Sequence, residues 1–328
     1  MEVLLLSEPE IRKMMGPAEA LPAVRDAFIR MARGEAVLPG VIHLDIPKSG
    51  AEVHVKGAHL HGSRFFTVKV ASGSYANPDR GLPTGSGIVL VFDATTGFPQ
   101  AVLFDNGYLT DLRTGAAGAL AADLLAKREV DRVGFVGVGT QARFQLEALL
   151  GVRTPGRVIA FGRSEGKADR FAQEMEKRHD IRVDLAKTVE QAVRGSDVVI
   201  TVTPSREPLV RAEWVLPGTH ITAVGADGPD KQELDVAVLE KADKVVADRL
   251  EQCVRLGEIH HAIEAGVFRP TDVYAELGEI AAGKKPGRTT DREITVADLT
   301  GVGVQDAALA ELVVGAAARQ RAGKTLDL

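Results

Sequence analysis

Apolar and polar positions repeat with two different periods along this 328-residue chain. From about residue 131 to residue 300, short runs of β-branched residues alternate with helical stretches, which is typical of a parallel sheet with helices on both faces. The predicted strands are Val133–Val136, Val158–Phe161, Val198–Val202, His220–Val224, Lys244–Ala247 and Glu293–Ala297. The predicted helices are Ala142–Leu150, Lys167–Lys177, Thr188–Arg194, Leu234–Lys241 and Leu250–Ala265. This number of strands is enough for a doubly wound α/β sheet of the Rossmann type.

The first part of the chain follows a different pattern. Leu21–Arg33 has the spacing of an amphipathic helix that ends near Gly34. Alternating segments follow it, and turn residues separate them, which predicts an antiparallel or mixed sheet. The predicted strands are Val41–Ile46, Glu52–Lys56, Phe65–Val70, Gly87–Asp93 and Pro99–Asp105.

Two long helical runs predict how these parts are connected. Asp111–Lys127 leads into the α/β region, and Val304–Ala322 follows it. We expect no strand after this second helix, so that it returns to the first domain. The predicted organisation is therefore an inserted α/β domain, residues 114–303, within a mixed α+β domain formed by residues 1–113 plus 304–328.

A glycine-rich turn follows the first strand of the α/β region. Its core is Gly137-x-Gly139-x-x-Ala142, placed between an apolar run and a helix. The first glycine turns the chain sharply, the second lets a pyrophosphate approach the backbone, and the small third residue lets the helix pack closely. The helix N-terminus then offers free N–H groups to phosphate. This order predicts a nicotinamide or flavin dinucleotide site, the alternative being a tight strand-to-helix turn in another α/β protein.

Composition excludes several classes of partner. Apolar residues make up 45% of the chain, charged residues 26%, and the net charge is −5, so no nucleic-acid or acidic-membrane partner is expected. Cys253 is the single cysteine, which excludes an intrachain disulfide and fits a reducing compartment. No apolar run approaches the ~20 residues of a membrane span, and the N-terminus lacks the pattern of a signal peptide. We expect a cytoplasmic protein.

Several strings, in this order and spacing, resemble the ornithine cyclodeaminase/μ-crystallin family over essentially the whole chain. They are Val68-Lys-Val70, Gly81-Leu-Pro-Thr84, Leu109-Thr-Asp-Leu-Arg113-Thr-Gly-Ala-Ala117, Gly137-Val-Gly-Thr-Gln-Ala-Arg143, Val224-Gly-Ala-Asp227, Glu233-Leu-Asp235 and Gly303-Val-Gln-Asp306. Three strings, Glu52–Lys56, Leu103–Arg113 and Val273–Ile280, resemble in particular a branch of this family associated with ectoine utilisation. The resemblance implies a Rossmann domain plus a mixed-sheet domain that binds substrate and dimerises. It also implies hydride transfer between a nicotinamide nucleotide and an amine or imine carbon.

The resemblance assigns roles to individual residues. Lys69 and Arg113 match positions that hold the α-carboxylate of the substrate, and Lys69 also matches a catalytic position. Thr84 matches a position near the substrate, and Asp227 matches a catalytic acid that moves protons at the substrate nitrogen. The nucleotide positions are Gly137, Gly139, Thr140, Gln141, Ala142, Arg163, Ser164 and Thr203.

Each assignment has a structural alternative. Lys69 is otherwise an exposed lysine on an edge strand, and Arg113 a surface arginine. Arg113 is also expected to open a helix, an unfavourable place for a cation unless an anion binds there. Thr84 is otherwise a turn hydroxyl, and Asp227 a helix cap or loop residue, for which Asp230 and Asp235 are better candidates.

The second predicted strand ends near Phe161 and is followed by Arg163 and Ser164. An arginine at this place suits the 2′-phosphate of NADP, whereas an acid there holds the ribose hydroxyls of NAD. We expect NADP, with NAD as the alternative.

Two departures from the family concern the substrate. The arginine that many relatives have after a proline is absent, since Gly40 follows Pro39. Lys56 stands near a position where ornithine cyclodeaminase uses an acid to hold the distal ammonium of its substrate. A lysine at ~4 Å from that ammonium would repel it by a few kcal/mol, so an acidic or small neutral substrate is expected. The alternative is that Lys56 points to solvent.

The histidines have no metal-ligand spacing such as HExxH, so no metal site is expected. The leading hypothesis is therefore an NAD(P)-dependent imine reductase or amino-acid dehydrogenase that acts on a small substrate as a homodimer. The first alternative is a cyclodeaminase-type ammonia lyase that uses the nucleotide catalytically. The second is a binding protein without turnover.

Overall fold

The computed structural model describes residues 2–327 and divides the chain into two compact units. Unit 1 is Met1–Arg113 with Val302–Leu328, and unit 2 is Thr114–Gly301. The first junction therefore lies within one helix, α3 (Tyr108–Leu125).

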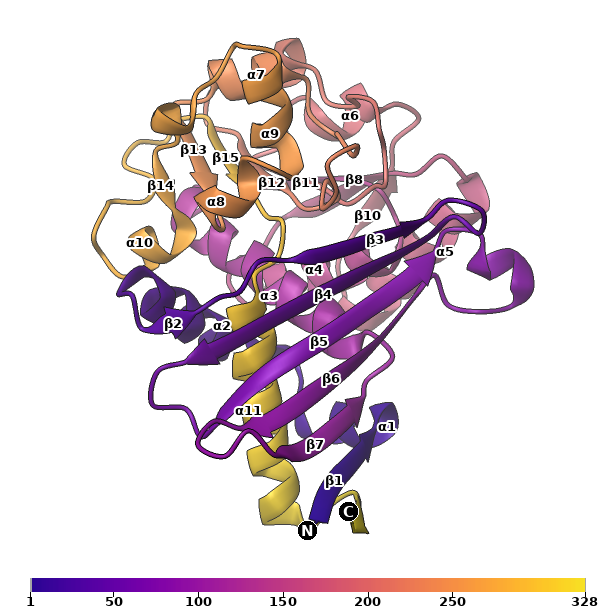
Figure 1. Cartoon of the computed structure of the whole chain (residues 1–328). Coiled ribbons are helices and arrows are strands. Elements are labelled where there is room, and N and C mark those ends of the chain that lie inside the picture. The colour runs from indigo at the N-terminus through magenta and orange to yellow at the C-terminus, as the bar shows by residue number, and fades with distance from the viewer. Residues whose placement is uncertain (1, 328) are drawn as a thin grey trace. The chain divides into compact units, whose positions relative to one another are not determined.

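Unit 1 is built on a mixed sheet in the order β16-β1-β7-β6-β5-β4-β2, with β3 paired to β4 (Figure 1). Only β1 and β7 run parallel among the pairs that the described residues form, and the other pairs are antiparallel. The strands are β1 (Glu2–Ser7), β2 (Ala36–Val37), β3 (Ile42–Ile46), β4 (Ala51–Leu60), β5 (Phe65–Ser74), β6 (Gly85–Asp93), β7 (Pro99–Phe104) and β16 (Lys324–Asp327). The helices are α1 (Glu8–Met14), α2 (Pro17–Ala32), the 3₁₀ helix η1 (Asn77–Arg80) and α11 (Gly303–Gln320).

One face of this sheet is covered by α11, which lies behind the strands in Figure 1. The helix is rich in alanine and begins at Gly303, where a Cβ would lie 2.5 Å from the carbonyl oxygen of Gly57. Small side chains thus let α11 approach β4 closely. Because successive strand residues point to opposite faces, every second residue of β4 is buried under the helix, from Lys56 to Ala58 and Leu60.

The end of the chain differs from expectation. A strand, β16, follows α11 and pairs antiparallel with β1, so the prediction that no strand follows this helix is wrong. Arg321 in the left-handed region (φ 53°) and Gly323 (φ 92°) end the helix and turn the chain back. Neither strand was predicted, because β16 is exposed and its partner lies at the other end of the sequence.

Unit 2 contains a parallel sheet in the order β10-β9-β8-β11-β12-β15-β13-β14. Its strands are β8 (Arg132–Val136), β9 (Arg157–Phe161), β10 (Val183–Leu185), β11 (Val198–Thr201), β12 (His220–Ala223), β13 (Lys244–Ala247), β14 (Ala275–Glu276) and β15 (Thr295–Asp298). Its helices are most of α3, then α4 (Thr140–Leu150), α5 (Glu165–His179), α6 (Val189–Val193), α7 (Val236–Lys241), α8 (Leu250–Cys253), α9 (Gly257–Glu264) and α10 (Leu277–Ala281), with the 3₁₀ helices η2 (Ala212–Trp214) and η3 (Pro270–Asp272). The strand order reverses between β8 and β11, which is where ligands bind in doubly wound sheets.

Unit 2 differs from the predicted elements in two ways. The predicted helix Leu250–Ala265 is interrupted between α8 and α9, where Leu256 is extended and Gly257, the first residue of α9, adopts φ 81°. The short edge strands β10 and β14 were missed, since two or three residues are too few to show a period. Among residues 2–327, no helix is long and apolar enough to cross a membrane. The cytoplasmic location stays a prediction.

Candidate active site

A group of buried cations occupies the covered face of the unit 1 sheet. Lys56 on β4 lies directly opposite Lys69 on β5. Both are buried, with 6% and 1% of the residue exposed. Two lysines facing each other across a ladder repel one another, and burial adds the cost of removing each charge from water. Such an arrangement needs a compensating negative charge.

The helices of unit 1 supply part of that charge. Asp306, in the first turn of α11, accepts a hydrogen bond from Lys69 Nζ at 3.0 Å and lies 3.4 Å from Arg113 Nε. Arg113, on α3, donates from Nη1 to Gln305 Oε1 at 3.3 Å, and Gln305 Nε2 donates to the Arg113 carbonyl oxygen. Asp306 therefore holds Lys69 and Arg113 in place.

The balance of charge in this group is positive. Among the buried charged side chains in the described part of unit 1, three are cations (Lys56, Lys69, Arg113) and two are carboxylates (Asp105, Asp306). Burial raises the pKa of Asp105, which disfavours its ionised form, and burial lowers the pKa of Lys69 against the attraction of Asp306. The group is thus suited to hold an additional anion.

Unused hydrogen-bonding atoms mark the same place. Thr67 Oγ1, Arg113 Nε and Asp306 Oδ2 are buried without a hydrogen-bond partner. Buried polar atoms in proteins almost always have a partner, so several unsatisfied atoms around one cation group indicate a place for a polar ligand. A carboxylate only accepts hydrogen bonds, so it fits the donors Arg113 Nε and Thr67 Oγ1, whereas Asp306 Oδ2 needs a ligand group that donates.

The structure decides between several of the alternatives left open by the sequence. Lys69 lies on a strand with neighbours on both sides, so the edge-strand interpretation is wrong. Lys56 is buried rather than solvent-facing. Arg113 lies in the second turn of α3 and does not open the helix, so the expected conflict with the helix dipole is much weaker than predicted. Thr84 is exposed in the loop before β6, and its backbone carbonyl accepts from the Ser74 amide.

The glycine turn in unit 2 has the geometry of a phosphate-binding loop. Gly137 adopts φ 111°, and a Cβ there would lie 2.8 Å from the carbonyl oxygen of Val202. Gly139 is exposed, with no atom near where its Cβ would be, and it precedes α4 without a side-chain cap. The N-terminus of α4, which begins at Thr140, thus lies next to an open glycine, as a phosphate site requires. Ala142 is buried, as close packing of α4 requires.

The other predicted nucleotide residues follow neighbouring strands. Arg163 is exposed just after β9, and Ser164 is the N-cap of α5. Thr203 follows β11, and its amide donates to Glu233 Oε1 at 2.6 Å. All of these residues lie at the carboxyl edge of the sheet, where ligands of such sheets bind.

Asp227 follows β12 at the same edge of the sheet. Its side chain is 46% exposed, and Oδ1 accepts a hydrogen bond from Lys231 Nζ at 2.9 Å. Nearby, the buried Glu233 accepts from the amides of Thr203 and Gly225, which joins the ends of β11 and β12. Burial raises the pKa of Glu233 to about 7. An exposed carboxylate on a loop that hydrogen bonds hold in place can exchange protons with a bound substrate.

Sequence reasoning missed several residues of these sites. Asp306 and Gln305 were part of a quoted motif but received no role, because their contacts reach residues more than 190 positions away. Arg143 donates to the carbonyl oxygens of Val138 and Gly139 and so fixes the glycine turn. Glu233 also lay in a quoted motif but was assigned no role, because its burial cannot be recognised from the sequence.

This turn and sheet order place unit 2 among the Rossmann-type nucleotide-binding folds. The whole chain belongs to the ornithine cyclodeaminase/mu-crystallin family, whose model matches residues 1–321. The chain is 43% identical over 328 residues to an alanine dehydrogenase of Archaeoglobus fulgidus, covering 99% of this chain and 98% of the relative. It is 33% identical over 331 residues to an iminosuccinate reductase of Paracoccus denitrificans, covering 99% of this chain and all of the relative (100%).

Solved structures of a similar dehydrogenase and a similar reductase match nearly the whole chain. An archaeal alanine dehydrogenase dimer with bound NAD matches with a TM-score of 0.94 and 42% identity, covering 100% of both chains. A Thermococcus litoralis Δ1-pyrroline-2-carboxylate reductase in complex with NADH and L-proline matches with a TM-score of 0.94 and 33% identity, covering 98% of this chain and 99% of that chain. The predicted family, the fold class and an oxidoreductase of the imine reductase and amino-acid dehydrogenase type are thereby confirmed. A nicotinamide nucleotide as cofactor is supported at the level of NAD or NADH.

Proposed function

We propose that this enzyme reduces the C=N bond of a small imino acid, or oxidises the matching amino acid, with the cation group of unit 1 holding the substrate carboxylate. The position of two buried cations, Lys69 and Arg113, against the single carboxylate of Asp306 carries this proposal. Arg113 supplies planar paired donors and Lys69 a point charge, both suited to a carboxylate. Thr84 is proposed as a further substrate contact.

The proton transfers are assigned to this chain's own side chains. When bound, the nicotinamide ring supplies or accepts the hydride. In the reducing direction the imine carbon gains the hydride and the nitrogen gains a proton, for which Asp227 is the proposed donor. Lys231, paired with Asp227 at 2.9 Å, holds the carboxyl group in place, and a proton from solvent, which reaches the half-exposed Asp227 side chain, restores the donor after each transfer. Lys69 has the second catalytic role, orienting the substrate through its carboxylate.

The nucleotide is proposed to bind along Gly137, Gly139, Thr140, Gln141, Ala142, Arg163, Ser164 and Thr203. The open space at Gly139 and the uncapped start of α4 support a pyrophosphate position. The exposed Arg163 at the end of β9 supports a preference for NADP, since its guanidinium suits a 2′-phosphate.

The substrate side chain is proposed to be acidic or small and neutral. Lys56 is buried on the same sheet face as Lys69, so a cationic substrate group in this region would be repelled. A second carboxylate would instead be attracted. The similarity to an iminosuccinate reductase is compatible with this choice.

A panel of substrates tests the function. NADPH and NADH oxidation at 340 nm is followed with small 2-oxo acids plus ammonia or methylamine, with cyclic imino acids, and with oxaloacetate plus ammonia. We expect turnover on at least one of these and a shift away from acidic substrates in Lys56→Glu. Rapid ammonia release from ornithine without net absorbance change would instead identify a cyclodeaminase, and no turnover on any substrate would favour a binding protein.

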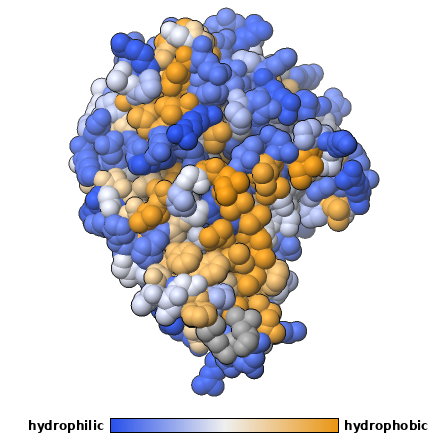
Figure 2. Space-filling model, viewed as in Figure 1, coloured by the Kyte–Doolittle hydropathy of each residue, from blue (hydrophilic) through white to orange (hydrophobic). Residues whose placement is uncertain are grey.

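A homodimer is proposed through the open face of the unit 1 sheet. Figure 2 shows hydrophobic residues gathered over the strands on this side. Ile42, Leu44 and Ile46 of β3 are 47–55% exposed there. A contiguous exposed apolar face of this kind is typical of an interaction site. The similarity to an alanine dehydrogenase dimer supports a second copy of the chain as the occupant.

A further inference from the structure

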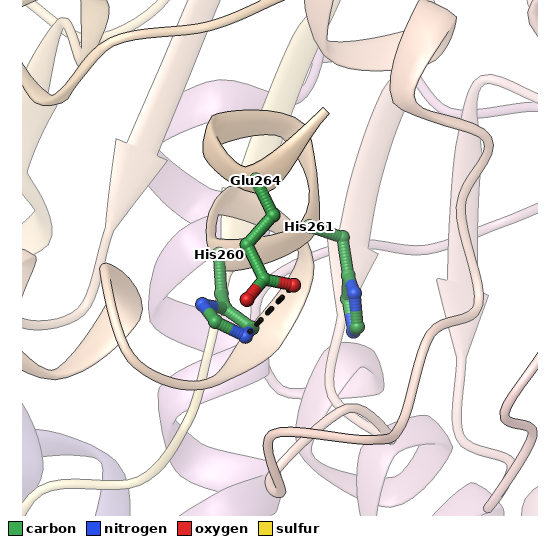
Figure 3. A group of neighbouring side chains, drawn as sticks. All are labelled: His260, His261 and Glu264. Carbon is green, nitrogen blue, oxygen red and sulfur yellow. Dashed lines mark ion pairs between the residues drawn. The ribbon is translucent and has the colours of Figure 1, made fainter. Parts of the chain in front are cut away.

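A histidine pair and a glutamate meet on α9, a helix to which neither the proposed substrate group nor the nucleotide turn belongs. One nitrogen from each of His260 and His261 and one carboxylate oxygen of Glu264 lie within 4.8 Å of one another. Figure 3 shows the three side chains directed to the same side of the helix. His260 and Glu264 are four residues apart and therefore share a helix face.

The hydrogen bonds of the two imidazoles define which nitrogens are free. His261 Nε2 lies 2.8 Å from the carbonyl oxygen of Lys231, and His260 Nδ1 lies 3.3 Å from that of Val254. A carbonyl oxygen only accepts, so each of these nitrogens carries a hydrogen. In the neutral rings, His260 Nε2 and His261 Nδ1 then carry lone pairs. Histidines that bind metals usually donate their other N–H to a carbonyl or carboxylate in this way.

His260 and Glu264 lie close enough to bind the same ion. His260 Nε2 lies 3.4 Å from Glu264 Oε2. We propose that a divalent transition-metal ion, Zn²⁺ or one of similar preference, binds to His260, His261 and Glu264. No metal site was predicted from the sequence because the histidines lack a spaced motif such as HExxH. This group instead combines adjacent histidines with a glutamate one turn later.

The donor set selects the kind of metal. Two imidazole nitrogens and one carboxylate oxygen suit Zn²⁺, Co²⁺ or Ni²⁺, whereas Mg²⁺ and Ca²⁺ prefer oxygen ligands alone. Water would complete a tetrahedral shell. The Glu264 side chain is 65% exposed, so the metal has access from solvent. Bound metal would also fix the His261 ring that holds the Lys231 carbonyl, and Lys231 pairs with Asp227.

Metal titration of the whole protein tests this site. We expect saturable binding of a single Zn²⁺ per chain by calorimetry, and a visible absorption band typical of tetrahedral coordination when Co²⁺ is used. Glu264→Gln should weaken the affinity for Zn²⁺ by at least ~10-fold, as should His260→Gln. Because the Glu264 side chain is exposed, its replacement should not disturb folding. Glu251→Gln, a 70% exposed carboxylate on the neighbouring helix α8, and His179→Gln are matched controls that should bind as the wild type does.

Two results would overturn the proposal. One is the absence of saturable Zn²⁺ binding to the wild-type protein, which would make His260 and Glu264 a simple ion pair completed by a proton. The other is unchanged binding in both Glu264→Gln and His260→Gln, which would locate the metal elsewhere, for example at the His43–His54 pair in unit 1.

Discussion

Removing one member of a buried charged group leaves the other charges uncompensated, at a cost of about 3–5 kcal/mol. Single residues among Lys69, Arg113 and Asp306 are therefore decisive for stability and, under the proposed function, for substrate binding. Asp306 compensates Lys69 and Arg113 within unit 1. At the carboxyl edge of the unit 2 sheet, in contrast, Arg163 and Asp227 are partly or largely exposed, so we expect their replacement to have little effect on folding.

Asp306→Asn should lower the free energy of unfolding by about 3 kcal/mol, since the amide cannot offset the charges of Lys69 and Arg113. Urea denaturation measures this loss. A substrate or product carboxylate that fills the cation group should return part of the lost stability. Asp79→Asn, at an exposed turn, is the control and should change stability by less than about 0.5 kcal/mol. Equal stability of Asp306→Asn and the wild type would show that the group is not under electrostatic strain.

Asp227→Asn should reduce turnover by ~10²-fold or more and leave nucleotide binding nearly intact, because asparagine keeps the shape but cannot transfer a proton. Steady-state kinetics together with nucleotide titration separate the two effects. Asp230→Asn, which removes an exposed ion pair with Arg206 in the same loop, serves as the control. Turnover of Asp227→Asn at the wild-type rate would assign Asp227 a structural role only.

Arg163→Ala should weaken NADPH more than NADH. A lost charge-assisted contact to the 2′-phosphate costs on the order of 1.5–3 kcal/mol, which corresponds to roughly 10-fold to 150-fold in the dissociation constant. Fluorescence titration with both nucleotides measures the difference. Arg170→Ala, an exposed arginine on α5, is the matched control. A similar loss for both nucleotides would refute the assignment of Arg163 to the phosphate.

At the scale of elements, buried carboxylates join the segments at the carboxyl edge of the unit 2 sheet. Glu233 accepts from the amides that follow β11 and β12, and Glu258 accepts from the amides of Glu233 and Leu234. Asp298, at the end of β15, accepts from the Ile259 amide in α9. Burial raises the pKa of Glu233 to about 7 and that of Asp298 to about 8, and it raises the pKa of Glu258 well above its usual value.

These shifts predict how stability depends on pH. The folded state holds protons on Glu233 and Asp298 at a pH where the unfolded chain has released them. Their contribution to stability is therefore complete below the ordinary carboxyl pKa and is lost as the pH rises through about 7 and 8. We expect the free energy of unfolding to fall as the pH rises from the ordinary carboxyl pKa to about 8. The fall should be less steep in Glu233→Gln than in Glu240→Gln, a surface control. Stability that stays level or rises through the window in the wild type would contradict this account.

At the scale of the whole molecule, the open apolar face of the unit 1 sheet is the proposed dimer interface. Leu44→Lys introduces a charge at the centre of β3, where Leu44 is 53% exposed. If a second copy covers this face, burying the lysine should weaken the dimer by at least ~100-fold. Sedimentation velocity over a range of concentrations measures the change. Leu185→Lys, at an exposed leucine of unit 2, should leave the dimer intact. A Leu44→Lys protein that remains dimeric at the lowest concentrations would place the interface elsewhere.

Much of the fold follows from local sequence patterns. The change from alternating to helical periods placed most strands and helices within a few residues of their observed bounds, because these periods come from the geometry of each element. The glycine turn was also recognisable, since the need for φ 111° at Gly137 and for a small residue at Ala142 arises within one strand–turn–helix unit. Short or interrupted elements, such as β10 and the break at Gly257, carry too little local pattern to be predicted.

Contacts between distant segments were decided only by the tertiary structure. Resemblance marked Lys69 and Arg113 as cations for a carboxylate, but the register of β4 against β5 is what places Lys56 opposite Lys69 in the interior. Asp306 meets Lys69 across 237 residues of sequence, and β16 pairs with β1 from opposite ends of the chain. A charge has the same sequence signature whether it is exposed or buried. Burial and register depend on how separate elements pack, so only the folded chain shows which charges compensate one another.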